Sequence, residues 1–438
     1  MLKTFRGGVH PKDYKSIASE ITVETMPPPQ RVVIPVSQHI GAPGVPTVAV
    51  GDTVKKGQLI ARADASMTSW VHASISGKVA DIAEYPSSYK DKSLAVVIES
   101  DGLDEWAPDI PAVRDYESLS LEELHKLIGQ AGLVGLGGAN FPTHFKLTYG
   151  PEKHIDTLLI NGSECEPYLN ADYRVMMEET DRVVLGAKIA MKSLGVSRCI
   201  VGIEDNKPKA VEAMKKAFEG TGVQVAALPT KYPQGAERMF IKVLTGREIP
   251  EGKRHSDIGV VGLNVGSVAA LANAVEKGVP LIERVITVSG DAIAAPKNLR
   301  VRIGTSFQDI VDYCGGFSRT PEKIINGGPM MGYAVRSLDI PVVKGVAGIL
   351  VLSKDAVSHD EESPCIRCGK CVEACPAGLV PSMLSILSER GRHEEARRDY
   401  GLLNCIECGS CAYICPSKRR IVQYIRYSKS KNAGHGHK

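Results

Sequence analysis

Eight of the eleven cysteines lie in two blocks, one at residues 365–375 and the other at 405–415. Both blocks read C-x2-C-x2-C-x3-C-P. In this spacing three thiolates of one loop, and a fourth from the other block, hold a [4Fe–4S] cube. The crossing predicts two clusters. The first would use Cys365, Cys368, Cys371 and Cys415, and the second Cys405, Cys408, Cys411 and Cys375.

Two other readings of these cysteines are open. Zinc also accepts C-x2-C pairs, but four ligands close a zinc site and leave the third C-x2-C step and the Cys-Pro unused. A secreted disulfide framework would need cysteines throughout the chain, yet only Cys165, Cys199 and Cys314 precede the blocks. Helical spacing at 380–400 predicts two short helices between the blocks, so residues 351–438 resemble an α-helical two-cluster ferredoxin domain.

A glycine-rich segment follows a predicted amphipathic helix at 121–130. Its glycines at 132, 135, 137 and 138 permit close approach of backbone amides to a phosphate. The usual G-x-G-x-x-G between a strand and a helix is absent, so a tight connection remains the alternative.

Strands and helices then alternate along the chain. The strands are predicted at 156–160, 198–204 and 223–228, and the helices at 182–194 and 209–218. This alternation indicates a parallel, Rossmann-like sheet. Polar residues at 161–167 (NGSECEP) follow the first strand, and ligands bind at the carboxyl ends of strands in such sheets.

Four runs carry a family resemblance: GLVGLGGANFPTHFK at 132–146, NGSECEP at 161–167, YPQGAERMF at 232–240 and NVGSVAALANA at 264–274. They resemble the flavin-binding, NADH-oxidising subunit of respiratory complex I. The RnfC subunit of the Rnf complex is the closer resemblance and covers almost the whole chain. The run NGGPMMG at 326–332 and the cysteine blocks fit the Rnf family better.

The resemblance implies a set of FMN and NADH contacts. Phosphate and ribityl contacts would come from Gly135, Gly137, Gly138 and Lys146. Asn161 and Glu164 would contact the flavin, and Phe141 would stack on the nucleotide. Further matching positions are Glu166, Tyr232, Gly235, Glu237 and Asn264. The chain departs from the family at Ala236 and Leu263, where polar ligands are replaced. A solvated surface pair is the alternative for Lys146 and Glu237.

Two further modules flank this region. Short β-prone runs at 32–99 resemble the lipoyl or biotinyl carrier fold, a barrel-sandwich hybrid, but residues 58–76 contain no lysine to modify. We therefore interpret the module as a docking element. Two strands and a helix within 285–316 resemble a β-grasp, SLBB-like module. The predicted domains are 1–110 (barrel-sandwich hybrid), 111–275 (Rossmann-like, FMN/NADH), 276–350 (β-grasp) and 351–438 (ferredoxin-like with a basic tail).

Composition limits the function classes. The 438 residues include 53 basic and 50 acidic side chains, so no strong net charge calls for nucleic acid. No run approaches the roughly 20 apolar residues of a membrane span. The resemblance implies a peripheral subunit, on the cytoplasmic face, of an ion-translocating NAD:ferredoxin oxidoreductase. Its cofactors would be FMN, NAD(H) and two [4Fe–4S] clusters, and its partners the other Rnf subunits and, indirectly, ferredoxin. A soluble flavin/iron–sulfur cobalamin reductase and a non-catalytic electron-relay scaffold are the alternatives.

Overall fold

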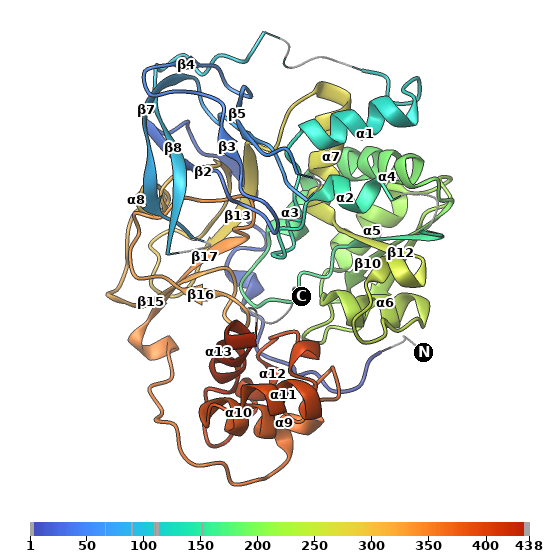
Figure 1. Cartoon of the computed structure of the whole chain (residues 1–438), viewed down its shortest axis with the longest axis vertical. Helices are drawn as coiled ribbons and strands as arrows, with labels where there is room; N and C mark the ends of the chain where they lie inside the picture. The colour runs from blue at the N-terminus through green and yellow to red at the C-terminus, as the bar shows by residue number, and fades with distance from the viewer. Residues whose placement is uncertain are drawn as a thin grey trace.

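The computed structural model describes residues 4–65, 67–88, 91–108, 110, 114–149 and 153–432. It places the parts of the chain around two large cores, with the cysteine-rich helices at one end (Figure 1). No helix within these ranges is both long and apolar enough to cross a membrane.

A parallel sheet forms the centre of the predicted Rossmann-like domain. Its order is β11 (Gln224–Leu228), β10 (Arg198–Glu204), β9 (Thr157–Asn161) and β12 (Val260–Asn264). The chain moves outward from β9 through β10 to β11, and β12 pairs on the other side of β9. The strand order therefore reverses between β9 and β12, and this reversal is where α/β sheets bind ligands.

Helices cover both faces of this sheet. On one face, buried side chains of β9, β10 and β12 share a core with five longer helices and with Leu147 of a short one, whereas α6 (Glu237–Thr245) covers the other face. The five helices are α1 (Leu121–Gln130), α3 (Ala171–Glu178), α4 (Thr180–Leu194), α5 (Pro208–Ala217) and α7 (Val265–Lys277). Helix α1 begins with a capping box between Ser120 and Glu123 and has the predicted bounds. The short α2 (Thr143–Leu147) follows the glycine-rich segment.

The barrel-sandwich module consists of two antiparallel sheets. One has the order β2 (Arg31–Pro35), β8 (Lys92–Ser100), β7 (Gly77–Pro86) and β4 (Thr53–Val54). The other consists of β3 (Val45–Pro46), β5 (Leu59–Arg62) and β6 (Val71–His72). At the hairpin tip the Met67 carbonyl accepts a hydrogen bond from the Ala42 N–H, at 3.0 Å, so the tip is packed against the module.

The β-grasp region is a six-stranded sheet with one helix, α8 (Phe307–Tyr313). The strand order is β1 (Val23–Thr25), β14 (Lys297–Arg302), β13 (Glu283–Ser289), β17 (Gly348–Ser353), β15 (Pro321–Asn326) and β16 (Tyr333–Ala334). Side chains of this region and of the barrel-sandwich module, such as Leu299 and Ile34, belong to one buried core. The two predicted domains therefore pack as a single unit.

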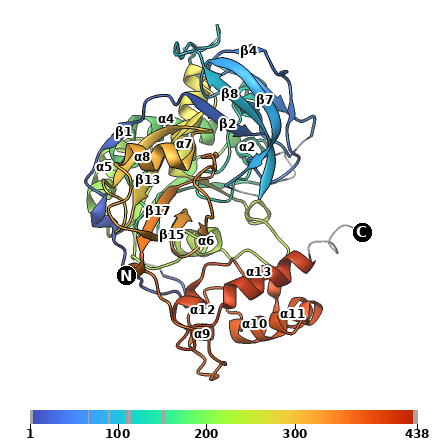
Figure 2. The same cartoon turned by 90° about the vertical axis from the view of Figure 1, so that its left-hand side faces the viewer.

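The cysteine-rich region is all helical. It contains α9 (Lys370–Glu373), α10 (Pro381–Glu389), α11 (His393–Tyr400), α12 (Ser410–Tyr413) and α13 (Ile421–Asn432). The two helices predicted between the cysteine blocks are α10 and α11, which pack with α13 in a small core of their own. Figure 2 shows this helical group apart from the sheets. Short 3-10 helices lie at Lys15–Ile17, His255–Ile258, Lys354–Ala356 and Leu402–Asn404.

Candidate functional site

Polar side chains meet where β9 and β12 end side by side. Asn161 and Asn264 are register partners at these ends. The Asn161 side-chain amide donates to the Gly235 carbonyl at 2.8 Å, which brings in the loop before α6. A Cβ on Gly137 would lie 3.3 Å from the Asn264 Cβ, so the glycine-rich loop also lies next to these strand ends. We call this group of four residues the switch-point site.

The glycine-rich loop is held in place by backbone bonds. The Gly135 N–H donates to the Phe141 carbonyl at 2.8 Å, and the Leu136 N–H donates to Ser267 Oγ at 2.8 Å. These bonds leave Gly137 and Gly138 exposed, and a Cβ on Gly138, whose φ is +98°, would meet nothing within 4 Å. The loop therefore presents open backbone next to the start of α7.

Asn264 caps that helix. Its Oδ1 accepts hydrogen bonds from the N–H groups of Gly266 (2.9 Å) and Ser267 (3.3 Å). Its Nδ2 donates to Asp172 at 2.7 Å. Burial, and then the charge of Glu164, raise the pKa of Asp172 to about 7. The first N–H groups of α7 are thus engaged by Asn264, and the open backbone of the glycine-rich loop is the part of this place that suits a phosphate.

Lys146 supplies a cation at the same place. Its Nζ lies 3.2 Å from Glu237 Oε1 and donates to the Gly262 carbonyl at 3.1 Å, and its side chain is 16% exposed. Burial alone would raise the pKa of Glu237, but Lys146 and His255 outweigh that effect and hold the pKa below its usual value. Lys146 and Glu237 do form a pair, yet Lys146 is mostly buried beside the Phe141 ring, 5.8 Å from its centroid. The predicted alternative of a solvated pair fits Glu237 only.

Two other predicted contacts are already engaged within the protein. The Glu164 carboxylate accepts hydrogen bonds from the N–H groups of Asp172 and Tyr173, at the start of α3. The Glu166 carboxylate accepts from the Met330 N–H (3.1 Å) and the Met331 N–H (2.8 Å), and burial raises its pKa. Their roles toward a flavin stay predictions.

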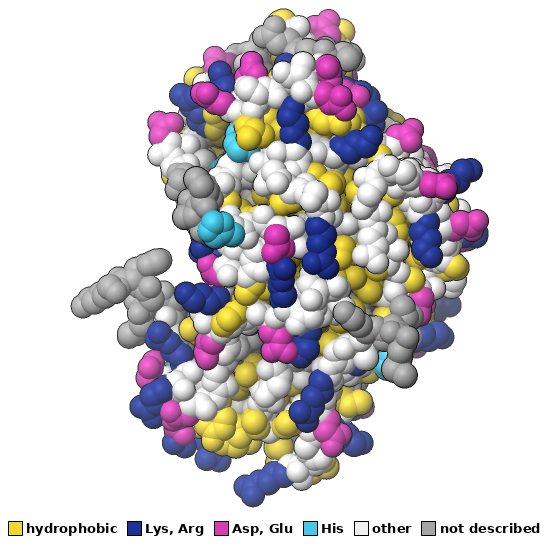
Figure 3. Space-filling model, turned by 90° about the vertical axis from the view of Figure 1, so that its right-hand side faces the viewer, with side chains coloured by type: hydrophobic (Ala, Val, Ile, Leu, Met, Phe, Trp, Pro, Cys, Tyr) yellow, Lys and Arg dark blue, Asp and Glu magenta, His cyan; other side chains and the backbone are white. Residues whose placement is uncertain are grey.

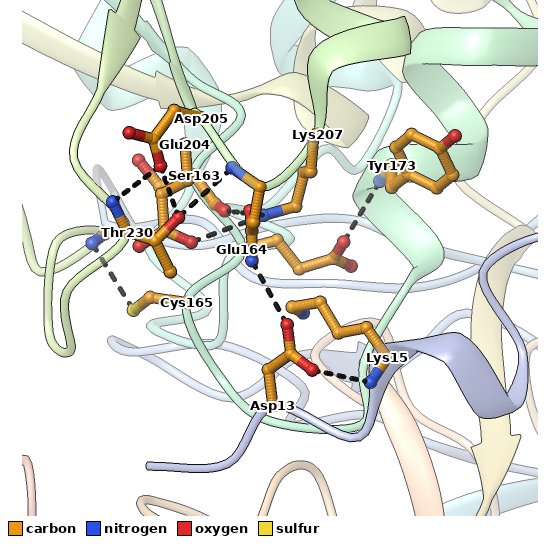
Figure 4. A network of polar contacts seen from close by, with 12 residues as sticks. Asp13, Lys15, Ser163, Glu164, Cys165, Tyr173, Glu204, Asp205, Lys207 and Thr230 are labelled. Atoms are coloured by element: carbon orange, nitrogen blue, oxygen red, sulfur yellow. Dashed lines mark hydrogen bonds and ion pairs between the residues drawn. The ribbon is translucent and has the colours of Figure 1, made fainter. Parts of the chain in front are cut away.

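Two buried lysines support the segment that contains Glu164 and Glu166 (Figure 4). Lys15 Nζ donates to the Glu166 and Leu169 carbonyls at 3.0 and 2.5 Å. Lys207 Nζ donates to the Ser163 carbonyl at 2.6 Å and lies 3.3 Å from the buried Glu204 carboxylate. Sequence reasoning missed Lys15, because it lies about 150 residues from the segment it supports and no local pattern marks it.

The eight cysteines surround two cavities, each of about 360 Å³ including open solvent. We call the first the proximal cavity; it is lined by Cys375, Cys405, Cys408 and Cys411. The second, the distal cavity, is lined by Cys365, Cys368, Cys371 and Cys415. Each cavity thus takes three cysteines from one block and one from the other. In the described ranges, no three or more His, Cys, Asp or Glu side chains are grouped to hold a single metal ion.

The proximal cavity borders the segments around the switch-point site. The Tyr232 hydroxyl donates to the Cys408 carbonyl at 2.7 Å and lies 3.4 Å from Glu166 Oε1. Tyr232 and Cys408 share a small apolar cluster with Cys165. Cys165 Sγ accepts a hydrogen bond from the Gly235 N–H at 3.3 Å, and burial raises the pKa of this thiol. Cys199 and Cys314 are buried thiols in the two large cores.

The residues present fit the predicted cofactors. The open loop and Lys146 provide what a phosphate needs, and each cavity offers the four thiols that a [4Fe–4S] cube requires. Comparison with known families agrees. Residues 128–273 match the Nuo51 FMN-binding domain and residues 357–416 the 4Fe-4S dicluster domain. Residues 3–103 match the RnfC barrel sandwich hybrid domain and residues 285–334 the SLBB domain. The chain is thus a flavin and iron–sulfur oxidoreductase subunit, with FMN and two [4Fe–4S] clusters as its cofactors.

Curated relatives define the family. The C subunit of the proton-translocating ferredoxin:NAD(+) oxidoreductase complex of Clostridium ljungdahlii is 58% identical, with 100% of this chain and 95% of the relative covered. Its counterpart in the Na(+)-translocating ferredoxin:NAD(+) oxidoreductase complex of Acetobacterium woodii is 46% identical, with 97% and 96% covered. The chain therefore belongs to the RnfC family, and these relatives are subunits of multi-subunit ion-translocating complexes.

A solved structure supports the fold. The air-oxidised NAD+-reducing [NiFe]-hydrogenase matches with a TM-score of 0.51 and 16% identity, over 70% of this chain and 63% of that chain. At this identity the match bears on the architecture only. The predicted multidomain α/β and β fold is confirmed by the family matches and by this similarity.

Proposed function

We propose that the chain exchanges electrons with NADH at FMN in the switch-point site and relays them singly through two clusters to or from partner subunits. FMN, when bound, converts between the two electrons of a hydride and the single electrons that iron–sulfur clusters carry. The observation that carries the proposal is the Tyr232–Cys408 hydrogen bond, because it joins the loop of Gly235 directly to a cysteine of the proximal cavity.

The protein's own residues have distinct tasks in this proposal. Lys146 would bind the FMN phosphate, and the open backbone at Gly137 and Gly138 would admit it. Asn161 and Asn264 would orient the cofactor from the strand ends. The buried lysines Lys15 and Lys207 hold the backbone of the 161–169 segment, so that this wall of the site keeps its shape.

The order of the clusters follows from the contacts of the two cavities. The proximal cavity would hold the first cluster after FMN. In the distal cavity Cys368 is exposed, and the neighbouring Ile366 is 67% exposed. Apolar side chains gather over the cluster domain at the lower end of Figure 3, with Lys and Arg around them. We place electron exchange with a partner subunit at the distal cluster, and the chain itself peripherally on the cytoplasmic face.

A mixing experiment tests this function. The chain would be reconstituted anaerobically, assayed for iron, sulfide and FMN, and mixed rapidly with NADH while flavin and cluster absorbance are followed. We expect flavin bleaching first and cluster bleaching afterwards. A preparation with clusters and no flavin bands would support the relay scaffold instead. NADH-dependent reduction of added cobalamin, faster than transfer to the partner subunits, would support the cobalamin reductase.

A further inference from the structure

Residues 4–25 lie outside the barrel-sandwich module and contact other regions of the molecule. Phe5 is buried in the core beneath α6. Further along, Tyr14 stacks on Tyr168 with ring centroids 4.6 Å apart, and β1 pairs with β14 of the β-grasp sheet. The dark-blue ribbon near the N-terminus passes beside the helical cysteine-rich region (Figures 1 and 2). We call residues 5–9 the N-terminal strap.

The strap lies between the loop of Tyr232 and the proximal cavity. Val9 and Tyr232 exchange two backbone hydrogen bonds of 2.9 Å. The preceding Gly8 N–H donates to the Ala374 carbonyl, also at 2.9 Å, next to the proximal ligand candidate Cys375. One short segment is therefore bonded on one side to the flavin-binding domain and on the other to the cluster domain.

Two glycines make this double contact close. Gly7 has a φ of +75°, and a Cβ there would lie 2.8 Å from the Cys375 carbonyl oxygen. Gly8 has a φ of +82°, and a Cβ there would lie 2.7 Å from the Tyr232 carbonyl oxygen. Any side chain at either position would therefore have to push the cysteine loop or the Tyr232 loop away.

The cluster domain depends on such contacts for its position. Its connection to β17 runs through residues 354–369, which form only the 3-10 helix Lys354–Ala356 before α9 begins. Other bonds to the rest of the molecule include Arg426 to the Met331 carbonyl and Asn404 to Glu251. The strap differs from these, because it contacts the residue beside Cys375 and the Tyr232 backbone at once.

We propose that the N-terminal strap is a spacer that sets the distance between the FMN site and the proximal cluster, with Gly7 and Gly8 as its positioning residues. The inference rests on the proposed electron relay. Electron transfer slows as the distance between two cofactors grows, and Gly7→Ala must move the Cys375 carbonyl by several tenths of an ångström. We therefore expect cluster reduction in that variant to be slower than in the parent.

The test compares Gly7→Ala with Gly102→Ala in the full chain. Gly102 has the same φ of +75° but nothing within 4 Å of a Cβ, so it controls for backbone strain. After mixing with NADH, both variants should bleach the flavin at the parent rate and hold the parent iron and FMN content. Only Gly7→Ala should reduce its clusters more slowly than the parent. Equal cluster reduction in Gly7→Ala and Gly102→Ala would overturn the spacer.

A second variant keeps the test sharp if Gly7→Ala loses its cluster. Lys231 Nζ donates to the Phe5 carbonyl at 2.7 Å and lies 4.5 Å from the Phe5 ring centroid. Lys231→Met keeps the apolar stem and removes this tether, so cluster reduction should be slower than in the parent while flavin bleaching is unchanged. Parent-like cluster reduction would count against the spacer. A parent chain whose clusters NADH cannot reduce would instead refute the proposed function.

Discussion

The two cysteine cavities share one sequence spacing and have different surroundings. In the proximal cavity Cys408 and Cys411 are buried, and the Cys408 carbonyl is bonded to Tyr232 of the flavin-binding domain. In the distal cavity Cys368 is exposed and Ile366 stands in solvent. The motif therefore specifies what each cavity can bind, whereas the contacts around it distinguish the cavity that borders the flavin-binding domain from the one that is open to solvent.

The largest expected effect comes from removing one cysteine ligand, first from the proximal cavity and then from the distal cavity. Cys375→Ala should remove the proximal cluster and with it NADH-driven reduction of the distal one, because the path from FMN is broken. Cys415→Ala should remove the distal cluster and leave the proximal one reducible by NADH. In both variants iron should fall from about eight to about four atoms per chain, by iron assay and electron paramagnetic resonance. Loss of the cluster beside Cys405 in Cys415→Ala would contradict the crossed sets.

The next prediction concerns variants that weaken or prevent FMN binding. Without FMN, the two cavities should no longer differ in their reduction by NADH. Lys146→Ala should weaken FMN about ten- to hundredfold, since a charge-assisted hydrogen bond contributes about 1.5–3 kcal/mol. Gly137→Val should prevent binding, because its side chain would fill the space beside Asn264. FMN titration measures both.

The control for that pair is Lys126→Ala, at an exposed position on α1. In Gly137→Val, NADH should reduce neither cluster and dithionite should reduce both, so the two cavities become equivalent. If Gly137→Val binds FMN as the parent does, the glycine-rich loop is a tight connection and nothing more.

Local patterns predicted much of this arrangement. The bounds of α1 and β10 agree with the predicted ranges to the residue. This is because capping and apolar periodicity depend on residues that are close together in the sequence. The cysteine spacing also predicted which four cysteines share each cavity, although their roles as ligands stay a prediction. The predicted domain boundaries stay predictions too.

Contacts between distant segments could not be predicted in this way. Lys15 supports the 161–169 segment, and Gly8 contacts Ala374, across sequence separations that leave no periodic signal. The shared core of the barrel-sandwich module and the β-grasp sheet arises from shape complementarity between two surfaces. Sequence reasoning assigned that module to docking alone, whereas the structure also packs it against the flavin-binding domain through Ile40 and Asn140.

A smaller effect concerns pH. The stability of the sheet domains should depend on the protonation of Lys344, whereas that of the cluster domain should not. Lys344 is buried, and its Nζ donates to the Trp70 and Gly132 carbonyls at 2.6 Å each. Burial lowers its pKa from 10.5 to about 7. Between these values the unfolded chain binds the extra proton, so the free energy of unfolding rises with pH, by at most about 1.4 kcal/mol per unit.

Thermal unfolding of the parent and Lys344→Met at pH 7, 8 and 9 measures this contribution. The parent should gain more stability with pH than the variant, since methionine has no proton to lose. Loss of cluster absorbance should follow the same pH profile in both, because the cluster domain has its own core. Parallel profiles for the sheet domains of parent and variant would show that Lys344 stays charged in the folded protein.

The smallest expected effect concerns the single hydrogen bond between Tyr232 and Cys408, which only the proximal cavity has. Tyr232→Phe removes the hydroxyl that donates to the Cys408 carbonyl and keeps the buried ring. A hydrogen bond of this kind contributes about 0.5–1.5 kcal/mol, so the fold and FMN binding should persist. Cluster potentials depend on nearby hydrogen bonds and on solvent exposure, so the potential of the proximal cluster should shift and that of the distal cluster should not. Redox titration with electron paramagnetic resonance resolves the two. Equal shifts in the potentials of both clusters would mean that Tyr232 acts on the cluster domain as a whole. The hydrogen bond would then not connect the proximal cavity specifically to the flavin-binding domain.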